Sequence, residues 1–207
     1  MEFTREIYWN VGHGPLTLVP MYLLAIGAMI FVARSFLSRS KVYKQGKELD
    51  RLDDPGARIG TMLKNVILQK MVIRGGGAGL LHGLFFWAFL VLVVGTTLVF
   101  IQADFTEPLF GFVFLKGGLY KLFSLALDLA GLAALVMLGG LFIRRYFLKP
   151  EGLETKSDDA IMHGLLFVIL ITGFIVEGAR MAVTEMGTPL ALWSPVGLIF
   201  AKGLGSI

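Results

Sequence analysis

Two histidines stand in matching short sequences, each a few residues into a long apolar run. Residues 81–86 read Leu-His-Gly-Leu-Phe-Phe, and residues 162–167 read Met-His-Gly-Leu-Leu-Phe. Metal-binding side chains are costly within hydrocarbon, so such histidines are functional candidates. A glycine after each lets a flat cofactor approach the helix backbone. We therefore predict His82 and His163 as axial ligands of one or two b-type haems. The alternative is a hydrogen bond from each histidine to a neighbouring helix.

Further polar residues occur in or beside apolar runs. Asp128 is interpreted either as a proton relay or quinone partner, or as a structural bond to another helix. Glu177 and Arg180 share a helix face at spacing i,i+3. They form either an interfacial salt bridge or a quinol site in which Glu177 accepts a proton. His13, in the segment before the first apolar run, is a weaker candidate for approaching a quinone or an outer haem.

Three arginines flank the apolar runs on one predicted side of the membrane. Arg74, Arg144 and Arg145 are first of all topology signals, since cytoplasmic loops are enriched in basic residues. Their guanidinium groups could also neutralise haem propionates at that surface. They are therefore kept as candidate cofactor-binding residues.

Composition places the chain among integral membrane proteins. Of its 207 residues, 56% are hydrophobic and 16% are charged. It has no cysteine, which excludes disulfides, Fe–S clusters held by this chain and covalently attached c-type haem. The net charge is +4. The charged residues lie beside the apolar runs, so membrane topology explains them better than binding to nucleic acid does, and we expect no nucleic-acid partner. We also expect no cleavable signal peptide.

Four apolar stretches are long enough to cross a bilayer, at residues 16–33, 79–102, 122–143 and 160–179. The expected fold is an all-α polytopic membrane helix bundle forming one domain over residues 1–207. The basic loops place 35–78 in the cytoplasm and the N-terminus outside, in the inner (cytoplasmic) membrane. Part of that loop, 59–73, is either an interfacial helix or a solvated linker. Residues 184–207 form an external tail, or the approach to an absent fifth helix.

These residues together resemble the haem b membrane module of the nitrate reductase gamma subunit type. The resemblance is greatest to the version fused to, or partnered with, heterodisulfide reductase-like Fe–S proteins, and it runs through nearly the whole chain. It is carried by residues 5–10, His82, Gly95-Thr96, Asp128, Arg144-Arg145-Tyr146, Pro150, Asp159, Thr172-Gly173, Glu177 and Arg180.

The resemblance implies a haem that relays electrons between membrane quinone and a soluble partner, with His82 as a ligand. In that family further ligands come from a fifth span, and this chain departs there by ending at Ile207. The predicted function is a cytochrome b subunit of a quinone-linked oxidoreductase complex. It would act between menaquinone or ubiquinone and a cytoplasmic Fe–S, heterodisulfide reductase-like or flavin-containing partner. The rival is a membrane anchor or assembly subunit without a redox group.

Overall fold

The computed structural model describes residue 4, residues 14–46 and residues 53–205. Every named element in these parts is a helix, which confirms the all-α prediction. In chain order they are α1 (Pro15–Tyr43), α2 (Pro55–Val66), α3 (Lys70–Ile73), α4 (Gly77–Ile101), the π-helical turn η1 (Gln102–Thr106), α5 (Glu107–Phe110), α6 (Gly117–Ile143), the π-helical turn η2 (Arg144–Leu148), α7 (Ser157–Thr184), the 3-10 turn η3 (Pro189–Trp193) and α8 (Pro195–Leu204).

Four of the described helical stretches are long and apolar enough to cross a membrane, as predicted. They are Pro15–Tyr43, Gly77–Phe110, Gly117–Leu148 and Ser157–Thr184. Each extends beyond its predicted ends, because polar and charged residues at the margins continue the same helix. The length and composition of these helices indicate a multi-pass membrane protein. Which end of the chain lies outside stays a prediction.

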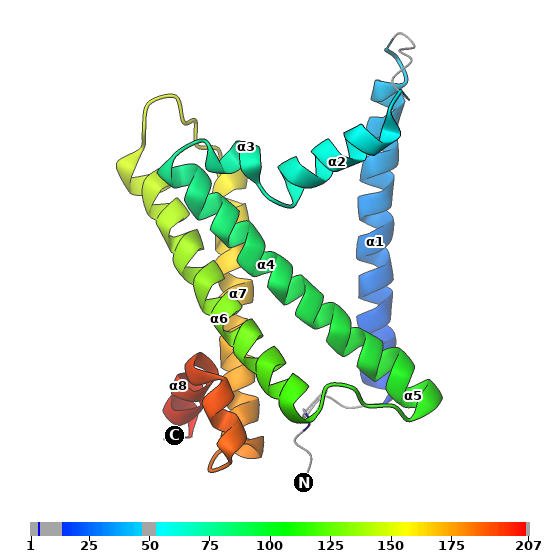
Figure 1. Ribbon diagram of the computed structural model, residues 1–207, viewed down its shortest axis with the longest axis vertical. Coiled ribbons are helices and arrows are strands. Elements are labelled where there is room, and N and C mark those ends of the chain that lie inside the picture. Colours follow the sequence, from blue (N-terminus) through cyan, green and yellow to red (C-terminus); the bar gives the residue numbers. More distant parts are fainter. Residues whose placement is uncertain (1–3, 5–13, 47–52, 206–207) are drawn as a thin grey trace. The chain divides into compact units, whose positions relative to one another are not determined.

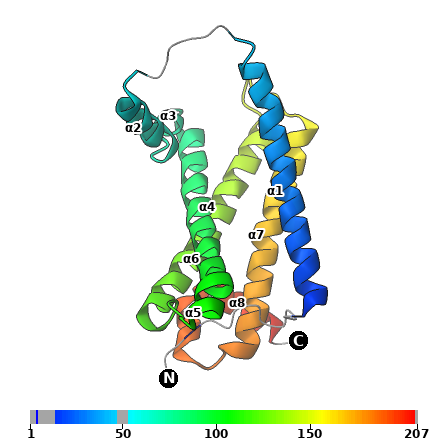
Figure 2. The same ribbon diagram turned by 90° about the vertical axis from the view of Figure 1, so that its right-hand side faces the viewer.

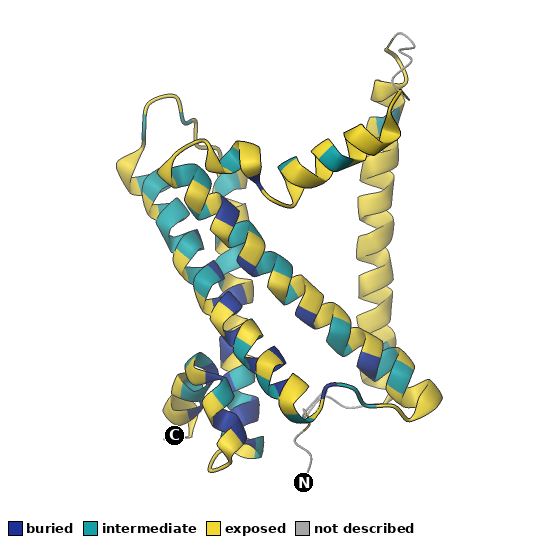
Figure 3. Ribbon diagram, viewed as in Figure 1, coloured by how far each residue is buried: buried dark blue, intermediate teal, exposed yellow. Residues whose placement is uncertain are grey.

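The chain divides into two compact units, one of residues 8–61 and one of the remaining residues. In the first unit, α1 begins with Pro15 directly after Gly14, a favourable first position because proline lacks the N–H that would be unpaired there. None of its residues is buried (Figure 3). Because its apolar side chains are exposed around the helix, lipid is the natural solvent for α1.

In the second unit, α6 packs against both α4 and α7 (Figure 1). Ala88 of α4, Ala134 and Leu138 of α6 and Leu170 of α7 form a buried apolar core. Small residues allow the close approach of α4 to α6. A Cβ placed on Gly95 would lie 2.3 Å from Cδ2 of Leu127. Gly95 therefore serves the packing of α4 against α6.

The predicted cytoplasmic loop is more helical than expected. Helix α1 continues to Tyr43, and the segment predicted at 59–73 includes most of α2 and all of the short α3. Helix α3 packs across the start of α4, where a Cβ on Gly83 would lie 3.0 Å from Cγ1 of Ile73. The loop therefore contributes a helix that covers the beginning of α4.

The C-terminal segment folds back onto the bundle. Its apolar helix α8 packs against α7 and α6 (Figures 1 and 2). Met181 of α7 and Ala201 of α8 are fully buried in this contact. The described part of the tail is therefore docked on the helices, where it completes the wall of a cavity.

Candidate functional site

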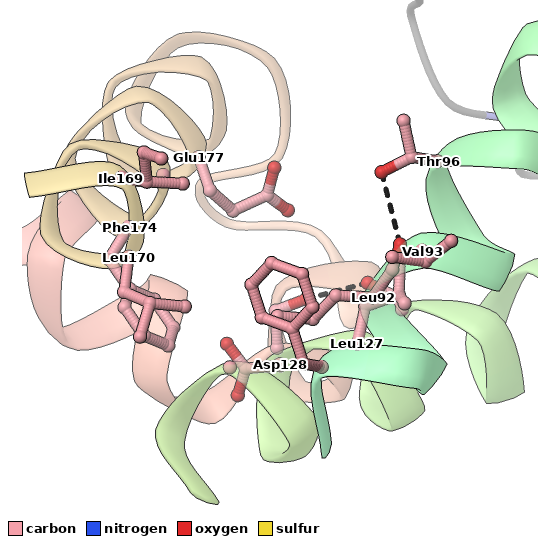
Figure 4. A pocket seen from close by; sticks show the side chains of 14 residues that line it. Leu92, Val93, Thr96, Leu127, Asp128, Ile169, Leu170, Phe174 and Glu177 are labelled. Carbon is pink, nitrogen blue, oxygen red and sulfur yellow. Dashed lines mark hydrogen bonds between the residues drawn. The ribbon is translucent and has the colours of Figure 1, made fainter. Parts of the chain in front are cut away.

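A cavity of about 380 Å³ lies among α4, α6 and α7 (Figure 4). Its volume is within the range of small-molecule sites, about 300–1,000 Å³. Most of its wall is apolar, and its polar groups are two carboxylates and three hydroxyls. The lining residues are Phe89, Leu92, Val93, Thr96, Ser124, Leu127, Asp128, Gly131, Ile169, Leu170, Gly173, Phe174, Glu177 and Ser194.

Asp128 lies in the cavity wall and also holds the first turn of α8. Its two carboxylate oxygens accept hydrogen bonds from the backbone N–H groups of Val196 and Gly197, each at 2.8 Å. A carboxylate is favoured at a helix N-terminus because the N–H groups there are unpaired and the helix dipole is positive. These two hydrogen bonds are the structural bond to another helix that was one of the two interpretations of Asp128. Its role as a proton relay or quinone partner stays a prediction.

Glu177 and Arg180 do share a helix face and pair, as their spacing predicted. Arg180 donates to Glu177 at 2.8 Å and 3.3 Å. On its other side, it donates to Glu185 at 2.5 Å. Tyr120 of α6 also donates to Glu185, at 3.2 Å. Because Glu177 lines the cavity, this ion cluster fixes a carboxylate in the cavity wall and ties α7 to α6.

His163 is half-buried near the start of α7, and its tautomer can be assigned. Its Nδ1 lies 2.7 Å from the backbone carbonyl oxygen of Asp159. A carbonyl only accepts hydrogen bonds, so Nδ1 must carry the proton. The Nε2 lone pair is then available to a metal, and a backbone partner of this kind also fixes the ring orientation. The rings of Phe142 and Tyr146 lie 6.2 Å and 5.7 Å from the imidazole.

Two buried hydrogen-bond donors next to His163 have no partner among the described residues. They are Nε of Arg145 and the hydroxyl of Tyr146. The Arg145 side chain otherwise donates to the Asp159 carboxylate at 2.5 Å and to the Glu154 carbonyl at 2.9 Å. Buried donors are normally satisfied. An acidic group of a ligand that reached either donor, such as a propionate, would satisfy it.

His82 has a different environment from His163 despite the matching sequence. It is exposed near the start of α4. Within the described residues, the hydrogen bond and ring contacts of His163 are to Asp159, Phe142 and Tyr146, with none to His82. The glycines that follow them also differ. Gly83 lies against α3, whereas Gly164 has no atom within 4 Å of its Cβ position. The expectation of an open backbone beside each histidine is therefore wrong for Gly83.

Both histidines nevertheless lie on the helix faces that form the cavity. His82 precedes Phe89 by seven residues and His163 precedes Leu170 by seven, which is two helical turns or about 10 Å. Phe89 and Leu170 both line the cavity. In the turns between, Phe85 and Phe167 pack on the buried core. The two histidines thus lie about two turns beyond the cavity, along the same helix faces.

Arg74 and Arg144 do not line the cavity. Arg74 is exposed at the end of α3, and Arg144 is half-buried at the start of η2. His13 lies outside the described residues. No group of three or more His, Cys, Asp or Glu side chains able to hold a metal occurs in the described ranges. A metal held by His82 and His163 would therefore bring its remaining ligands with it, as haem iron does.

Several site residues were missed by the sequence analysis. Tyr120, Ser124 and Asp128 are spaced four residues apart, so they form one polar stripe on the apolar helix α6. That spacing could have identified the first two. Ser194 precedes Pro195, a common start of a helix, and lines the cavity. Glu185 gave no comparable signal, because its partner Arg180 is five residues away in the chain.

Comparisons with known proteins give one curated relative. The chain is 32% identical over 212 aligned positions to EtfAB:quinone oxidoreductase of Syntrophomonas wolfei subsp. wolfei, and the match covers 98% of this chain. The chain spans only 28% of the length of that relative. No protein-family model matches the chain, and no solved structure does. The relative is named as a quinone oxidoreductase, which is compatible with the resemblance to the nitrate reductase gamma subunit type.

Proposed function

We propose that this chain is a membrane cytochrome b module that carries electrons between quinone and a soluble redox partner. The relative's name pairs EtfAB with quinone, and we extend that pairing to this chain. The partner would be EtfAB or a related flavin- or Fe–S-containing protein on the cytoplasmic side. The membrane would be the inner (cytoplasmic) membrane, with the N-terminus outside.

The observation that carries this proposal is the orientation of His163. Its Nδ1–H is used by the Asp159 carbonyl, so its Nε2 lone pair can bind iron. The neighbouring unpaired donors of Arg145 and Tyr146 fit haem propionates, and the surrounding rings fit an apolar macrocycle. These residues would fit one side of a b-type haem, and the proposal takes His82 as the second ligand. Bound there, the haem would supply one-electron chemistry.

The quinone would bind in the cavity, about two helical turns from the histidines, through side chains of this chain. The cavity offers an apolar wall for a ring, with Glu177 and Asp128 as polar groups. Arg180 holds the Glu177 carboxylate in place, so that carboxylate can accept a hydrogen bond from a quinol hydroxyl. Phe85 and Phe167, which pack on the apolar core, would separate the quinone from the haem ligands by apolar side chains.

The second candidate function is a membrane anchor without a redox group. It is favoured by the structural use of Asp128, whose carboxylate holds α8. The Arg145–Asp159 pair likewise joins η2 to α7. An anchor requires no cofactor, so visible absorbance by haem would distinguish a cytochrome from an anchor.

A reduced-minus-oxidised difference spectrum of the purified protein tests the proposal. We expect a b-type alpha band that is lost in both His82→Ala and His163→Ala. The matched control is Met162→Ala, which removes an exposed side chain beside His163 and should keep the band. Loss in only one histidine variant would overturn ligation by the two helices. Absence of the band from the wild type would favour the anchor.

A further inference from the structure

A pair of serine hydroxyls forms one polar corner of the cavity. Ser124 of α6 and Ser194, which precedes α8, are both buried and both line the cavity. Their Oγ atoms lie 2.6 Å apart, so one hydroxyl donates to the other. The two residues are 70 positions apart in the chain, and the pair exists only because α8 is docked on α6.

The hydrogen count of this pair leaves one donor unused. Each hydroxyl has one proton and can also accept. When one serine donates to the other, the accepting serine keeps its own O–H. In the described part of the chain, neither hydroxyl has a second hydrogen-bond partner. Since buried donors are normally satisfied, this proton is available to a ligand in the cavity.

The other polar groups of the cavity differ from this pair in kind. Glu177 and Asp128 are carboxylates, which accept hydrogen bonds when ionised. The hydroxyl of Thr96 already donates to the carbonyl of Leu92 at 3.0 Å. The serine pair is therefore the cavity's side-chain hydroxyl donor, and the rest of the wall is largely apolar.

We propose that the Ser124–Ser194 pair donates the hydrogen bond that holds a carbonyl oxygen of a quinone ring in this cavity. This inference rests on the proposed function and deepens it, since it names the group that recognises the oxidised substrate. The ring would lie against the apolar wall, which includes Phe89 and Phe174. A ring without carbonyl oxygens would fill the same space but would not use the donor.

The test compares two probes that share one carbon skeleton, of which only one carries carbonyl oxygens. Menadione carries the quinone carbonyls, and 2-methylnaphthalene has the same carbon skeleton without them. Binding to the purified protein is measured by equilibrium dialysis in detergent, with binding to protein-free micelles subtracted. The wild type should prefer menadione. The double variant Ser124→Ala/Ser194→Ala should lose about three- to tenfold of that preference, the effect of one neutral hydrogen bond.

The double variant is needed because either serine could donate after loss of the other. Its binding of 2-methylnaphthalene should be unchanged, which separates loss of the donor from collapse of the cavity. The control is Thr97→Val, because the Thr97 hydroxyl is exposed and donates to the carbonyl of Val93 at 2.8 Å. That variant should keep the wild-type preference.

Two results would overturn the inference. One is an unchanged preference for menadione in the double serine variant, and the other is equal binding of both probes by the wild type. Neither result alters the haem band described above, so failure of this inference can be told apart from failure of the cytochrome assignment.

Discussion

Replacing Arg180 with alanine should lower the free energy of unfolding by about 3–5 kcal/mol, the usual effect of removing one partner from a buried ion pair. The side chains of Arg180 and Glu185 are each 5% exposed, and that of Glu177 is 22% exposed. Without the guanidinium, two carboxylates would remain close together with little water. The measurement is the midpoint of denaturant unfolding of the purified protein in detergent.

The matched control is Arg145→Ala. Arg145 and Asp159 form an equally short ion pair, but their side chains are 22% and 32% exposed. Pairs with this access to solvent contribute about 0–1 kcal/mol. A triple variant, Arg180→Met with Glu177→Gln and Glu185→Gln, should regain most of the stability because it leaves no buried charge unpaired. Equal losses from Arg180→Ala and Arg145→Ala would show that the cluster is not buried as described.

Gly178→Ala should have the second large effect, by displacing α8. The added Cβ would lie 2.6 Å from Cβ of Phe200 and 3.0 Å from its backbone carbonyl carbon. Backbone cannot rotate away as a flexible side chain can. Overpacking of this kind costs about 1–3 kcal/mol, which exceeds the helix propensity gained from alanine, about 1 kcal/mol or less.

Trypsin cleavage after Lys202, an exposed residue of α8, measures this displacement directly. Cleavage should be faster in Gly178→Ala than in the wild type. Gly139→Ala is the control, since no atom lies within 4 Å of its Cβ position. That variant should gain stability and be cleaved at the wild-type rate. Wild-type cleavage of Gly178→Ala would contradict the tight docking of α8.

The membrane helices could be predicted from the sequence because apolar length alone defines them. The prediction of 122–143, for example, lies entirely within α6 (Gly117–Ile143). The docking of α8 could not be predicted in this way. Its apolar piece is too short to be identified by length, and its first turn is held by Asp128, 68 and 69 residues earlier in the chain.

The repeated histidine sequences show a second limit. Local sequence places His82 and His163 in similar positions on their helices, but it does not determine what packs beside them. Helix α3 covers Gly83, whereas Gly164 remains open. The Asp159 carbonyl that sets the His163 tautomer lies four residues back, and the identity of residue 159 does not affect that contact. The spacing of the pair Glu177 and Arg180, by contrast, correctly predicted its geometry.

The central claim is that electrons pass between quinone and a haem held by this chain. The most direct measurement is anaerobic addition of a reduced menaquinol analogue to the oxidised purified protein while the alpha band is recorded. The account predicts that quinol reduces the haem, and that Glu177→Gln slows this reduction without changing the band produced by dithionite. A haem that dithionite reduces but quinol does not would contradict the account.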